Sequence, residues 1–483
     1  MKFAAYLLAA AAAALGAAQQ FTEDSDLSAS ISVSTYERYQ TMVGSGCSGS
    51  FQRARDIFGR SGLSPQKQKE VIAFLFDPSL GSNRILRNGI GSSPNSTLDH
   101  MNSILPVCPP TPAGPFHYHF DGDDSAQLAL TKAALSHNKD LVIYADAWSA
   151  PGCMKNVGVD SEGGLLCGVR GSNCKHDWRQ AYANYIVQLV KFYAEQGITI
   201  SAVGPFNEAD YNPITYASMV SDGYQAKDVL EYLYPAMKAA FPNVSVACCD
   251  ETGARQARTQ LYELQKAGGG DLIDIYTYHS YQSDPQIPFQ TRKQAWMTEW
   301  ADGGGAWNPN WDVVGHMAEG LQWASYMHNA FVNADTSAWV HWQCAENNTG
   351  DNALIRLAGD DYFVSGRLWA QAGYFRFIEN GAQRIAASTS VEEVYVSAYQ
   401  NPNGTIAIPI INAARSPYTI TIDLFGTNAT TATAWLTDNN HNVTYAGSQS
   451  IKGNTLKVTV EPRALKTYLL SGDAPEKGHP HWP

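Results

Sequence analysis

Residues 140–147 read DLVIYADA, and Leu141 to Tyr144 form an unbroken apolar run. A strand exposed on one face alternates apolar and polar residues, so an unbroken run is typical of a parallel strand buried on both faces. Working outward, the sequence predicts further strands at Thr41–Phe51, Arg84–Gly91, Ile200–Phe206, Val244–Cys249, Leu272–Tyr278, Ala295–Thr298 and Ala338–Gln343. Helical patterns between and after them cover Ser64–Phe76, Ser125–His137, Asp177–Gln196, Gly223–Phe241, Arg255–Lys266, Trp311–Phe331 and Gly366–Ile378. The chain therefore alternates strands with helices.

Eight strands separated by helices over roughly 300 residues match an α/β fold of the (β/α)8 TIM-barrel type. A doubly wound open sheet is the alternative. From Arg384 to Leu470 the sequence changes to short alternating runs rich in Thr, Val and Ile, separated by turn pairs such as Asn403-Gly404. This pattern predicts a side β-sandwich. The run Ala29–Ser34 alternates in the same way, so an N-terminal strand is expected to join that sandwich.

These patterns divide the chain into five segments. We expect a signal peptide at 1–18, an N-terminal segment pairing with the β-domain at 19–39, and a catalytic barrel at 40–381. The β-sandwich follows at 382–472 and a flexible tail at 473–483. The leader combines Lys2, the apolar stretch Phe3–Leu15 and the small residues Gly16-Ala17-Ala18, as secretory signals do. A membrane anchor is the alternative for this segment, although it is shorter than most spans.

Composition indicates a secreted, extracellular protein with a large core. The chain has 483 residues, 44% of them hydrophobic, and a net charge of −12. An acidic chain repels phosphate backbones and anionic lipids, so no nucleic acid or membrane partner is expected. Six N-x-[S/T] sequons are compatible with glycosylation. Eight cysteines in an oxidising compartment predict some disulfides, and the loop with Cys153, Cys167 and Cys174 is a candidate for one.

Two glutamates fall at the carboxyl ends of predicted barrel strands, where barrel enzymes place their chemistry. Glu208 follows the fourth strand and Glu299 ends the seventh. These strand ends face each other across a small barrel mouth. Two facing carboxyl groups are what glycoside hydrolysis requires, one protonated and one ionised. Apolar neighbours, Phe206 for one and Trp296 and Trp300 for the other, favour this interpretation over solvated surface positions.

Four ordered motifs resemble those of glycoside hydrolase family 30. They are Trp148-Ser149-Ala150-Pro151 with Met154-Lys155, Asn207-Glu208, His279-Ser280-Tyr281 and Thr298-Glu299-Trp300. The stretch from Gly46 to Ala54 is similar to fungal secreted xylanases of subfamily 7. The resemblance covers nearly the whole mature chain and implies a barrel with a side β-domain and retention of anomeric configuration. It also implies that Glu208 is the general acid/base and Glu299 the nucleophile.

The same resemblance suggests residues that bind substrate. Asn207 would bond the sugar 2-hydroxyl, and Tyr281 would orient Glu299. His279, from the same motif as Tyr281, is a further candidate for substrate binding. Trp148 and Trp342 are candidates for sugar stacking, with core packing as the alternative.

Two arginines complete the set of candidates. Arg87 ends the second strand, where it could contact Glu299 or serve only as a salt-bridged barrel residue. In the similar fungal xylanases an arginine in the loop of Arg53 pairs with the glucuronic acid branch of xylan. A helix cap or an ion pair with Asp56 is the alternative role for Arg53.

The sequence thus predicts a retaining hydrolase that cleaves β-1,4-xylosidic bonds in xylan or glucuronoxylan, by endo or xylobiose-releasing action. A β-1,6-glucanase or β-glucosidase of the same family is the alternative, and a non-catalytic carbohydrate-binding protein is a second. No cofactor or metal is expected, because HExxH and CxxC signatures are absent from the sequence. A monomer is expected.

Overall fold

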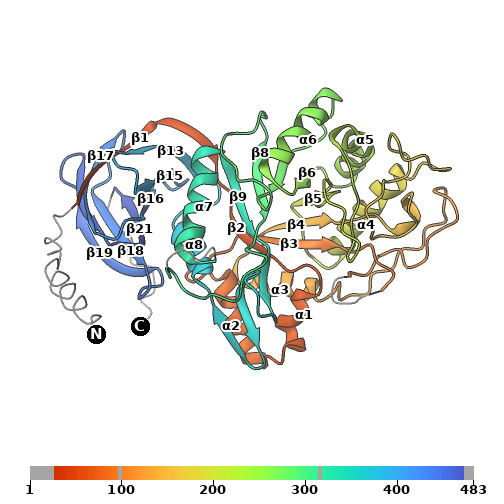
Figure 1. Cartoon of the computed structure of the whole chain (residues 1–483), viewed down its shortest axis with the longest axis horizontal. Coiled ribbons are helices and arrows are strands. Elements are labelled where there is room, and N and C mark those ends of the chain that lie inside the picture. Colours follow the sequence, from red (N-terminus) through yellow and green to blue (C-terminus); the bar gives the residue numbers. More distant parts are fainter. Residues whose placement is uncertain (1–26, 96–99, 314–317, 473–483) are drawn as a thin grey trace, which may run out of the picture.

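The computed structural model describes residues 27–95, 100–313 and 318–472. Its larger part is a closed barrel of eight parallel strands in chain order, and a β-domain packs beside it (Figure 1). The barrel strands are β2 (Gly44–Ser48), β3 (Ile85–Ile90), β4 (Val142–Ala147), β5 (Ala202–Gly204), β6 (Ser245–Glu251), β7 (Ile275–His279), β8 (Gln294–Glu299) and β9 (Thr336–His341). The predicted TIM barrel is confirmed, and the expected leader and tail lie outside the described residues.

The barrel closes where its first and last strands pair. Gly46 of β2 lies opposite Val340 of β9, which excludes the open-sheet alternative. A side chain at Gly46 would collide with the Ile85 backbone, since a Cβ there would lie 2.1 Å from the Ile85 oxygen. Glycine therefore allows β2 and β3 to approach. A disulfide links Cys47 of β2 to Cys344, which follows β9, across 297 residues of sequence.

The helices cover the barrel with amphipathic faces. They are α1 (Arg53–Arg55), α2 (Pro65–Phe76), α3 (Gln127–His137), α4 (Arg179–Glu195), α5 (Gly223–Ala240), α6 (Ala254–Lys266), α7 (Gly320–Asn333) and α8 (Gly366–Phe375), with short helices η1 (Asp56–Arg60) and η2 (Gly152–Met154). In α5 a capping box between Asp222 and Gln225 supplies partners for the first N–H groups. Buried Val229, Leu233 and Met237 recur every four residues along the same helix.

One helix begins later than the sequence predicts. The expected helix Trp311–Phe331 corresponds to α7, which starts at Gly320. Trp311 lies in the preceding loop, where its indole N–H donates to the carbonyl of Arg463 in the β-domain, 2.8 Å away. The tertiary contact to the second domain therefore holds Trp311 outside the helix.

The β-domain contains both ends of the described chain. Strand β1 (Leu27–Thr41) pairs in antiparallel fashion with β13 and in parallel with β17, which confirms the predicted N-terminal strand. Alternate residues Ala29, Ile31 and Val33 are buried in the core of this domain. The other strands are β13 (Gln383–Thr389), β14 (Val394–Val396), β15 (Ala398–Gln400), β16 (Ile406–Asn412), β17 (Tyr418–Phe425), β18 (Thr431–Thr437), β19 (Thr444–Ser450), β20 (Thr455–Val460) and β21 (Ala464–Ser471).

A small third sheet extends the loop after the last barrel strand. It consists of β10 (Gln343–Glu346), β11 (Ala353–Ala358) and β12 (Asp361–Val364). Because β10 follows β9 directly, this sheet places Glu346 above the carboxyl end of the barrel.

All eight cysteines form disulfides in the structure. The pairs are Cys47–Cys344, Cys108–Cys153, Cys167–Cys174 and Cys248–Cys249. The expected clamp within the glycine-rich loop is the Cys167–Cys174 bond, whereas Cys153 bonds outside that loop to Cys108. Among the helices of the described residues, none has the length and apolar character needed to cross a membrane.

Candidate active site

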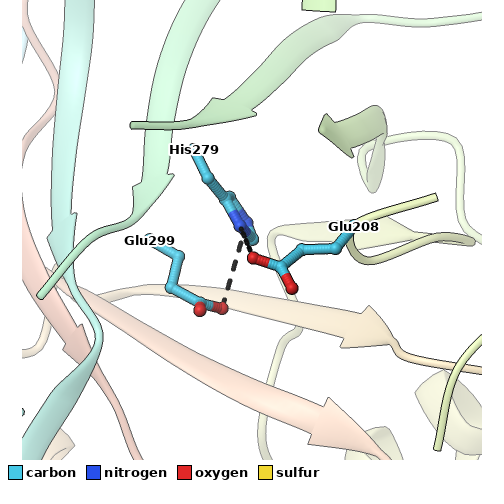
Figure 2. A group of neighbouring side chains, drawn as sticks. All are labelled: Glu208, His279 and Glu299. Atoms are coloured by element: carbon cyan, nitrogen blue, oxygen red, sulfur yellow. Dashed lines mark hydrogen bonds and ion pairs between the residues drawn. The ribbon is translucent and has the colours of Figure 1, made fainter. Parts of the chain in front are cut away.

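Glu208 and Glu299 meet over the mouth of the barrel. Glu208 lies four residues after β5, the fourth barrel strand, and Glu299 is the last residue of β8, the seventh. A carboxylate oxygen of each, together with a ring nitrogen of His279, lie within 4.8 Å of one another. In Figure 2 the imidazole of His279 stands between the two carboxyl groups. Opposite strands of the barrel thus bring together two glutamates that are 91 residues apart in the sequence.

Glu208 is held by its backbone and by His279. Its N–H donates to the carbonyl of Asp250 at 2.7 Å, and its φ of 48° places it in the left-handed region. Oε1 of Glu208 lies 3.2 Å from Nδ1 of His279. Burial raises the pKa of Glu208 to about 8, and the negative charge of Asp210 adds to this effect. At neutral pH this group therefore holds a proton that it can donate.

Glu299 lies among hydrogen-bond donors. The Nη1 atom of Arg87 donates to its Oε2 atom, and the hydroxyl of Tyr281 donates to Oε1 at 2.9 Å. Burial raises the pKa of Glu299 above its ordinary value, while Arg87 opposes this shift through its positive charge. Two donors, of which Arg87 is also a cation, stabilise the ionised form of Glu299, so the two carboxyl groups differ in their surroundings. This difference is what separate acid and nucleophile roles require.

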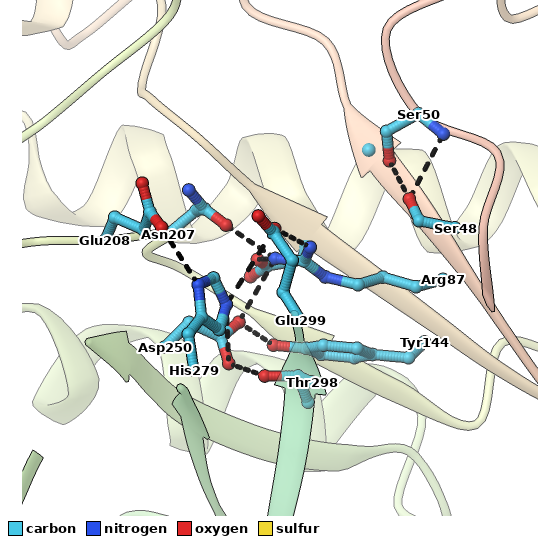
Figure 3. A network of polar contacts seen from close by, with 12 residues as sticks. Ser48, Ser50, Arg87, Tyr144, Asn207, Glu208, Asp250, His279, Thr298 and Glu299 are labelled. Atoms are coloured by element: carbon cyan, nitrogen blue, oxygen red, sulfur yellow. Dashed lines mark hydrogen bonds and ion pairs between the residues drawn. The ribbon is translucent and has the colours of Figure 1, made fainter. Parts of the chain in front are cut away.

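Arg87 also organises the neighbouring polar groups. Its Nη2 atom donates to Oδ1 of Asn207 at 2.5 Å and to Oδ2 of Asp146 at 2.7 Å. The amide of Asn207 is therefore fixed with its oxygen toward Arg87 and its nitrogen turned away from it (Figure 3). Burial of the Arg87 side chain is complete, and the surrounding carboxylates keep its pKa above the ordinary value.

The predicted aromatic residues form one cluster beside the two glutamates. The Trp148 ring lies 4.4 Å from the Arg87 guanidinium carbon and 4.8 Å from the Phe51 ring. Only 2% of Trp148 is exposed, so its buried ring packs against the guanidinium of Arg87. Trp342 lies 5.9 Å from Trp148 and is only partly buried. Of these two tryptophans, Trp342 has the more accessible ring.

Arg53 is paired with an acidic residue far away in sequence. Its Nε atom lies 2.7 Å from Oε1 of Glu346 on β10, and Nη1 donates to the carbonyl of Phe51 at 2.9 Å. Asp56, the alternative partner weighed from the sequence, accepts instead a hydrogen bond from Arg60 at 2.7 Å. The guanidinium of Arg53 therefore already lies beside a carboxylate.

Sequence reasoning missed several polar residues beneath the two glutamates. Asp146 and Asp250 are fully buried at the ends of β4 and β6, and Tyr144 and Thr298 donate to Asp250. Single aspartates near strand ends are common, so their type carries little information. The available signal was position, because Asp146, like Glu208 and Glu299, lies near the carboxyl end of a barrel strand.

Within the described part of the chain, Glu208, His279 and Glu299 form the single group of three residues with the spacing of metal ligands. The guanidinium of Arg87 contacts the Glu299 carboxylate and disfavours a cation at the same place. His279 is fully buried and its pKa is lowered, chiefly by burial. A neutral imidazole between two carboxyl groups fits a hydrogen-bonding role better than a metal site.

Two family profiles match the chain. The "Glycosyl hydrolase family 30 TIM-barrel domain" covers residues 117–364, and the "Glycosyl hydrolase family 30 beta sandwich domain" covers residues 381–468. Together they span the barrel and the β-domain described above. The chain belongs to glycoside hydrolase family 30 and is a glycoside hydrolase.

Individual relatives carry different activities in their names. The catalytic domain of GH30 xylanase C from Talaromyces cellulolyticus superposes with a TM-score of 0.84 and is 35% identical, covering 92% of this chain and 100% of that one. Glucuronoxylanase XynC of Bacillus subtilis is 22% identical over 71% of this chain and 77% of its own length. Endo-1,6-beta-D-glucanase BGN16.3 of Trichoderma harzianum is 24% identical over 60% and 62%.

Proposed function

We propose that the protein is a retaining xylanase that cleaves β-1,4-xylosidic bonds in xylan, including glucuronoxylan. The observation that carries this proposal is the close approach of Glu208 and Glu299, whose oxygens lie within 4.8 Å. Retaining enzymes separate their carboxyl groups by about 5–5.5 Å and inverting enzymes by about 6.5–9.5 Å, to leave room for a water molecule. The xylan specificity rests on the 35% identity with xylanase C of Talaromyces cellulolyticus.

In the first step, an ionised oxygen of Glu299 attacks C1 of the xylose unit. The bond from C1 to the glycosidic oxygen breaks, and the proton of Glu208 passes to that oxygen. The raised pKa of Glu208, about 8, keeps this proton available at neutral pH. Arg87 and Tyr281 orient Glu299 for attack, because each donates a hydrogen bond to one of its oxygens.

In the second step, Glu208 acts as a base. The ionised carboxylate takes a proton from water as that water attacks C1, and the bond from C1 to Glu299 breaks. Two inversions at C1 restore the β-configuration.

Asn207 is proposed to donate its amide N–H to the sugar 2-hydroxyl, since Arg87 holds the amide oxygen. Trp342 is proposed to stack on a sugar, while Trp148 is proposed to hold Arg87 in place through its ring.

For the glucuronic acid branch we propose Arg53 as the contact residue. Because Glu346 already pairs with Nε of Arg53, a uronate would bind next to an existing carboxylate. The repulsion between these two carboxylates reduces the gain from the branch. Comparing glucuronoxylan with the same polymer after reduction of its uronic acids tests this role. A clear loss of activity on the reduced polymer supports the contact, and equal rates contradict it.

A β-1,6-glucanase or β-glucosidase is the alternative, and the Trichoderma harzianum relative favours the glucanase. Purified protein incubated with glucuronoxylan, linear arabinoxylan and a β-1,6-glucan distinguishes them. Xylo-oligosaccharides from the xylans are the expected result. Release of sugar from the glucan alone would contradict the xylanase proposal. Binding without release of any sugar would favour a non-catalytic carbohydrate-binding protein.

We also propose that the protein acts outside the cell as a monomer on plant cell-wall polysaccharide. Four disulfides support this location, because such bonds persist in oxidising compartments. The leader-like residues 1–18 of the sequence agree with it. Detection of the mature protein in culture medium, with its N-terminus sequenced, would test secretion.

A further inference from the structure

Asp250 makes hydrogen bonds next to both glutamates. Its backbone carbonyl accepts the N–H of Glu208 at 2.7 Å. Its side chain accepts a hydrogen bond from Thr298, the residue directly before Glu299, and another from the Tyr144 hydroxyl at 2.6 Å. Figure 3 shows the side-chain contacts of Asp250 with Tyr144 and Thr298. One residue therefore restrains the backbone of Glu208 and the residue next to Glu299.

Asp250 also faces the cationic and imidazole groups of the site. Its carboxylate lies 3.6 Å from Nη2 of Arg87 and 3.8 Å from Nε2 of His279. The Nε2 atom of His279 is buried and has no hydrogen-bond partner within usual distance. The closest acidic atoms to it are those of Asp250 and Glu299. The negative charge of Asp250 thus orients His279, whose other nitrogen contacts Glu208.

Asp146 lies beside Asp250, and the two cannot both be ionised. Both side chains are fully buried and share one guanidinium, Arg87. Two adjacent carboxylates in a buried site hold one proton between them. Burial and the charge of Asp250 raise the pKa of Asp146, whereas the positive charge of Arg87, with the hydrogen bonds that Asp250 accepts, outweighs burial and lowers the pKa of Asp250. Asp146 is therefore the protonated member.

A shared proton also explains an otherwise unsatisfied atom. Oδ2 of Asp146 accepts from Arg87, but its buried Oδ1 has no partner when the carboxyl group is ionised. A protonated Oδ1 would have a proton to donate to the neighbouring carboxylate of Asp250. Unsatisfied buried polar atoms are costly, so the protonated form removes a penalty.

We propose that Asp250 is a positioning residue for catalysis, acting as the ionised partner of a protonated Asp146. The pair aligns Glu208 through the Asp250 backbone and Glu299 through Thr298 and Arg87. Asp250 keeps one negative charge near His279 and Glu208, while Asp146 fills its site as a neutral hydrogen-bond donor. The inference rests on the proposed function, because it assigns the acid and nucleophile to Glu208 and Glu299.

The titratable and charged groups around this pair come from every neighbouring element. They are Arg87 on β3, Tyr144 on β4, Glu208 and Asp210 after β5, Glu251 on β6, Tyr276 and His279 on β7, and Glu299 on β8. Among them, Glu208 is the group whose proton the reaction uses. Its pKa is raised in part by the charge of Asp250.

Two isosteric variants test the assignment. Asparagine resembles a protonated carboxyl group, since it offers one acceptor and one donor. Asp146→Asn is expected to lower kcat far less than Asp250→Asn and to leave the alkaline limb of the pH profile in place, because the amide keeps one acceptor for Arg87 and one donor. Asp250→Asn removes the charge and is expected to lower kcat by about 10²-fold, as misplaced catalytic groups do. The alkaline limb of the pH profile of Asp250→Asn is expected to move to lower pH, because the loss of a nearby negative charge lowers the pKa of Glu208.

The measurement is the pH dependence of kcat on a xylo-oligosaccharide, whose poor leaving group needs the proton of Glu208, for wild type and both variants. A merely structural role for Asp250 would lower the amount of folded enzyme without moving the alkaline limb. Equal losses in the two variants, or an unmoved limb in Asp250→Asn, would overturn the proposal. A wild-type enzyme with no glycosidase activity would instead refute the proposed function itself.

Should Asp250→Asn fail to fold, Tyr144→Phe gives a second test. It removes one hydrogen-bond donor to Asp250 and keeps the ring. Loss of this donor leaves the Asp250 side chain less firmly positioned, so kcat is expected to fall while KM changes little. A wild-type kcat for this variant would contradict the positioning role.

Discussion

The hydroxyl of Tyr281 donates a hydrogen bond of 2.9 Å to Oε1 of Glu299. This bond stabilises the ionised carboxylate that the proposed mechanism needs, and it restricts the direction of the attacking oxygen. Tyr281 follows β7, so the residue is independent of the strand that bears Glu299.

Replacing this tyrosine tests its contribution. We expect Tyr281→Phe to reduce kcat roughly 10- to 100-fold, because a hydrogen bond to a charged group contributes about 1.5–3 kcal/mol. KM should change less, and the ring should keep its contact with His279, whose centroid lies 6.1 Å away. Steady-state kinetics on xylan oligosaccharides provide the measurement. An unchanged kcat would show that Tyr281 does not assist Glu299.

Removing the proposed acid should affect substrates unequally. In Glu208→Ala no proton reaches the leaving oxygen, so polymeric xylan should be cleaved very slowly. Aryl xylosides with good leaving groups need little protonation and should keep substantial turnover. Azide can occupy the vacated space and attack the intermediate, and we expect it to accelerate the reaction and yield a β-xylosyl azide. Loss of activity equally on both substrates, without azide rescue, would argue against this role.

The pH profile of kcat/KM should be bell-shaped. Glu208 must be protonated, so activity should fall as the pH rises through about 8, the pKa of this group. Glu299 must be ionised, and burial raises its pKa, so the acidic limb should lie above that of an ordinary glutamate.

A charge-removing variant distinguishes the two limbs. Asp210 raises the pKa of Glu208 through its negative charge. Asp210→Asn should therefore move the alkaline limb to lower pH and leave the acidic limb in place. Movement of the acidic limb instead would mean that Glu208 does not control the alkaline side.

The disulfide at the barrel seam should stabilise the fold. Cys47–Cys344 closes a loop of 297 residues, whereas Cys167–Cys174 closes one of 7. Loop-closure entropy gives about 6 kcal/mol for the long loop and about 2 kcal/mol for the short one. Replacing the first pair by alanines should therefore lower the free energy of unfolding more than replacing the second. Denaturant titrations of both double variants measure the difference, and a smaller effect at the seam would contradict this expectation.

The fold was largely predictable because its strands carry a strong local signal. Runs such as Leu141–Tyr144 are buried on both faces, and parallel barrel strands need this composition. The position of Glu208 and Glu299 at the barrel mouth was predictable for a related reason, since each follows such a run. Trp311 was misplaced in a helix because its conformation depends on Arg463, which belongs to another domain.

The partners of the site residues were less predictable. Arg53 pairs with Glu346, 293 residues away, and no local pattern links the two positions. The pairing of Asp146 with Asp250 likewise depends on barrel closure, which brings β4 and β6 around one arginine. The sequence therefore indicated which residues meet at the barrel mouth better than it indicated what holds them there.

The most direct test of the proposed mechanism is to trap its covalent intermediate. A 2,4-dinitrophenyl 2-deoxy-2-fluoro-β-xylobioside slows both steps, and its good leaving group lets the first proceed. We predict that one fluoroxylobiosyl group accumulates on the protein and that peptide mass spectrometry places it on Glu299. Glu299→Gln should show neither labelling nor turnover of xylan. A label on another residue, or full turnover of xylan by Glu299→Gln, would contradict the account.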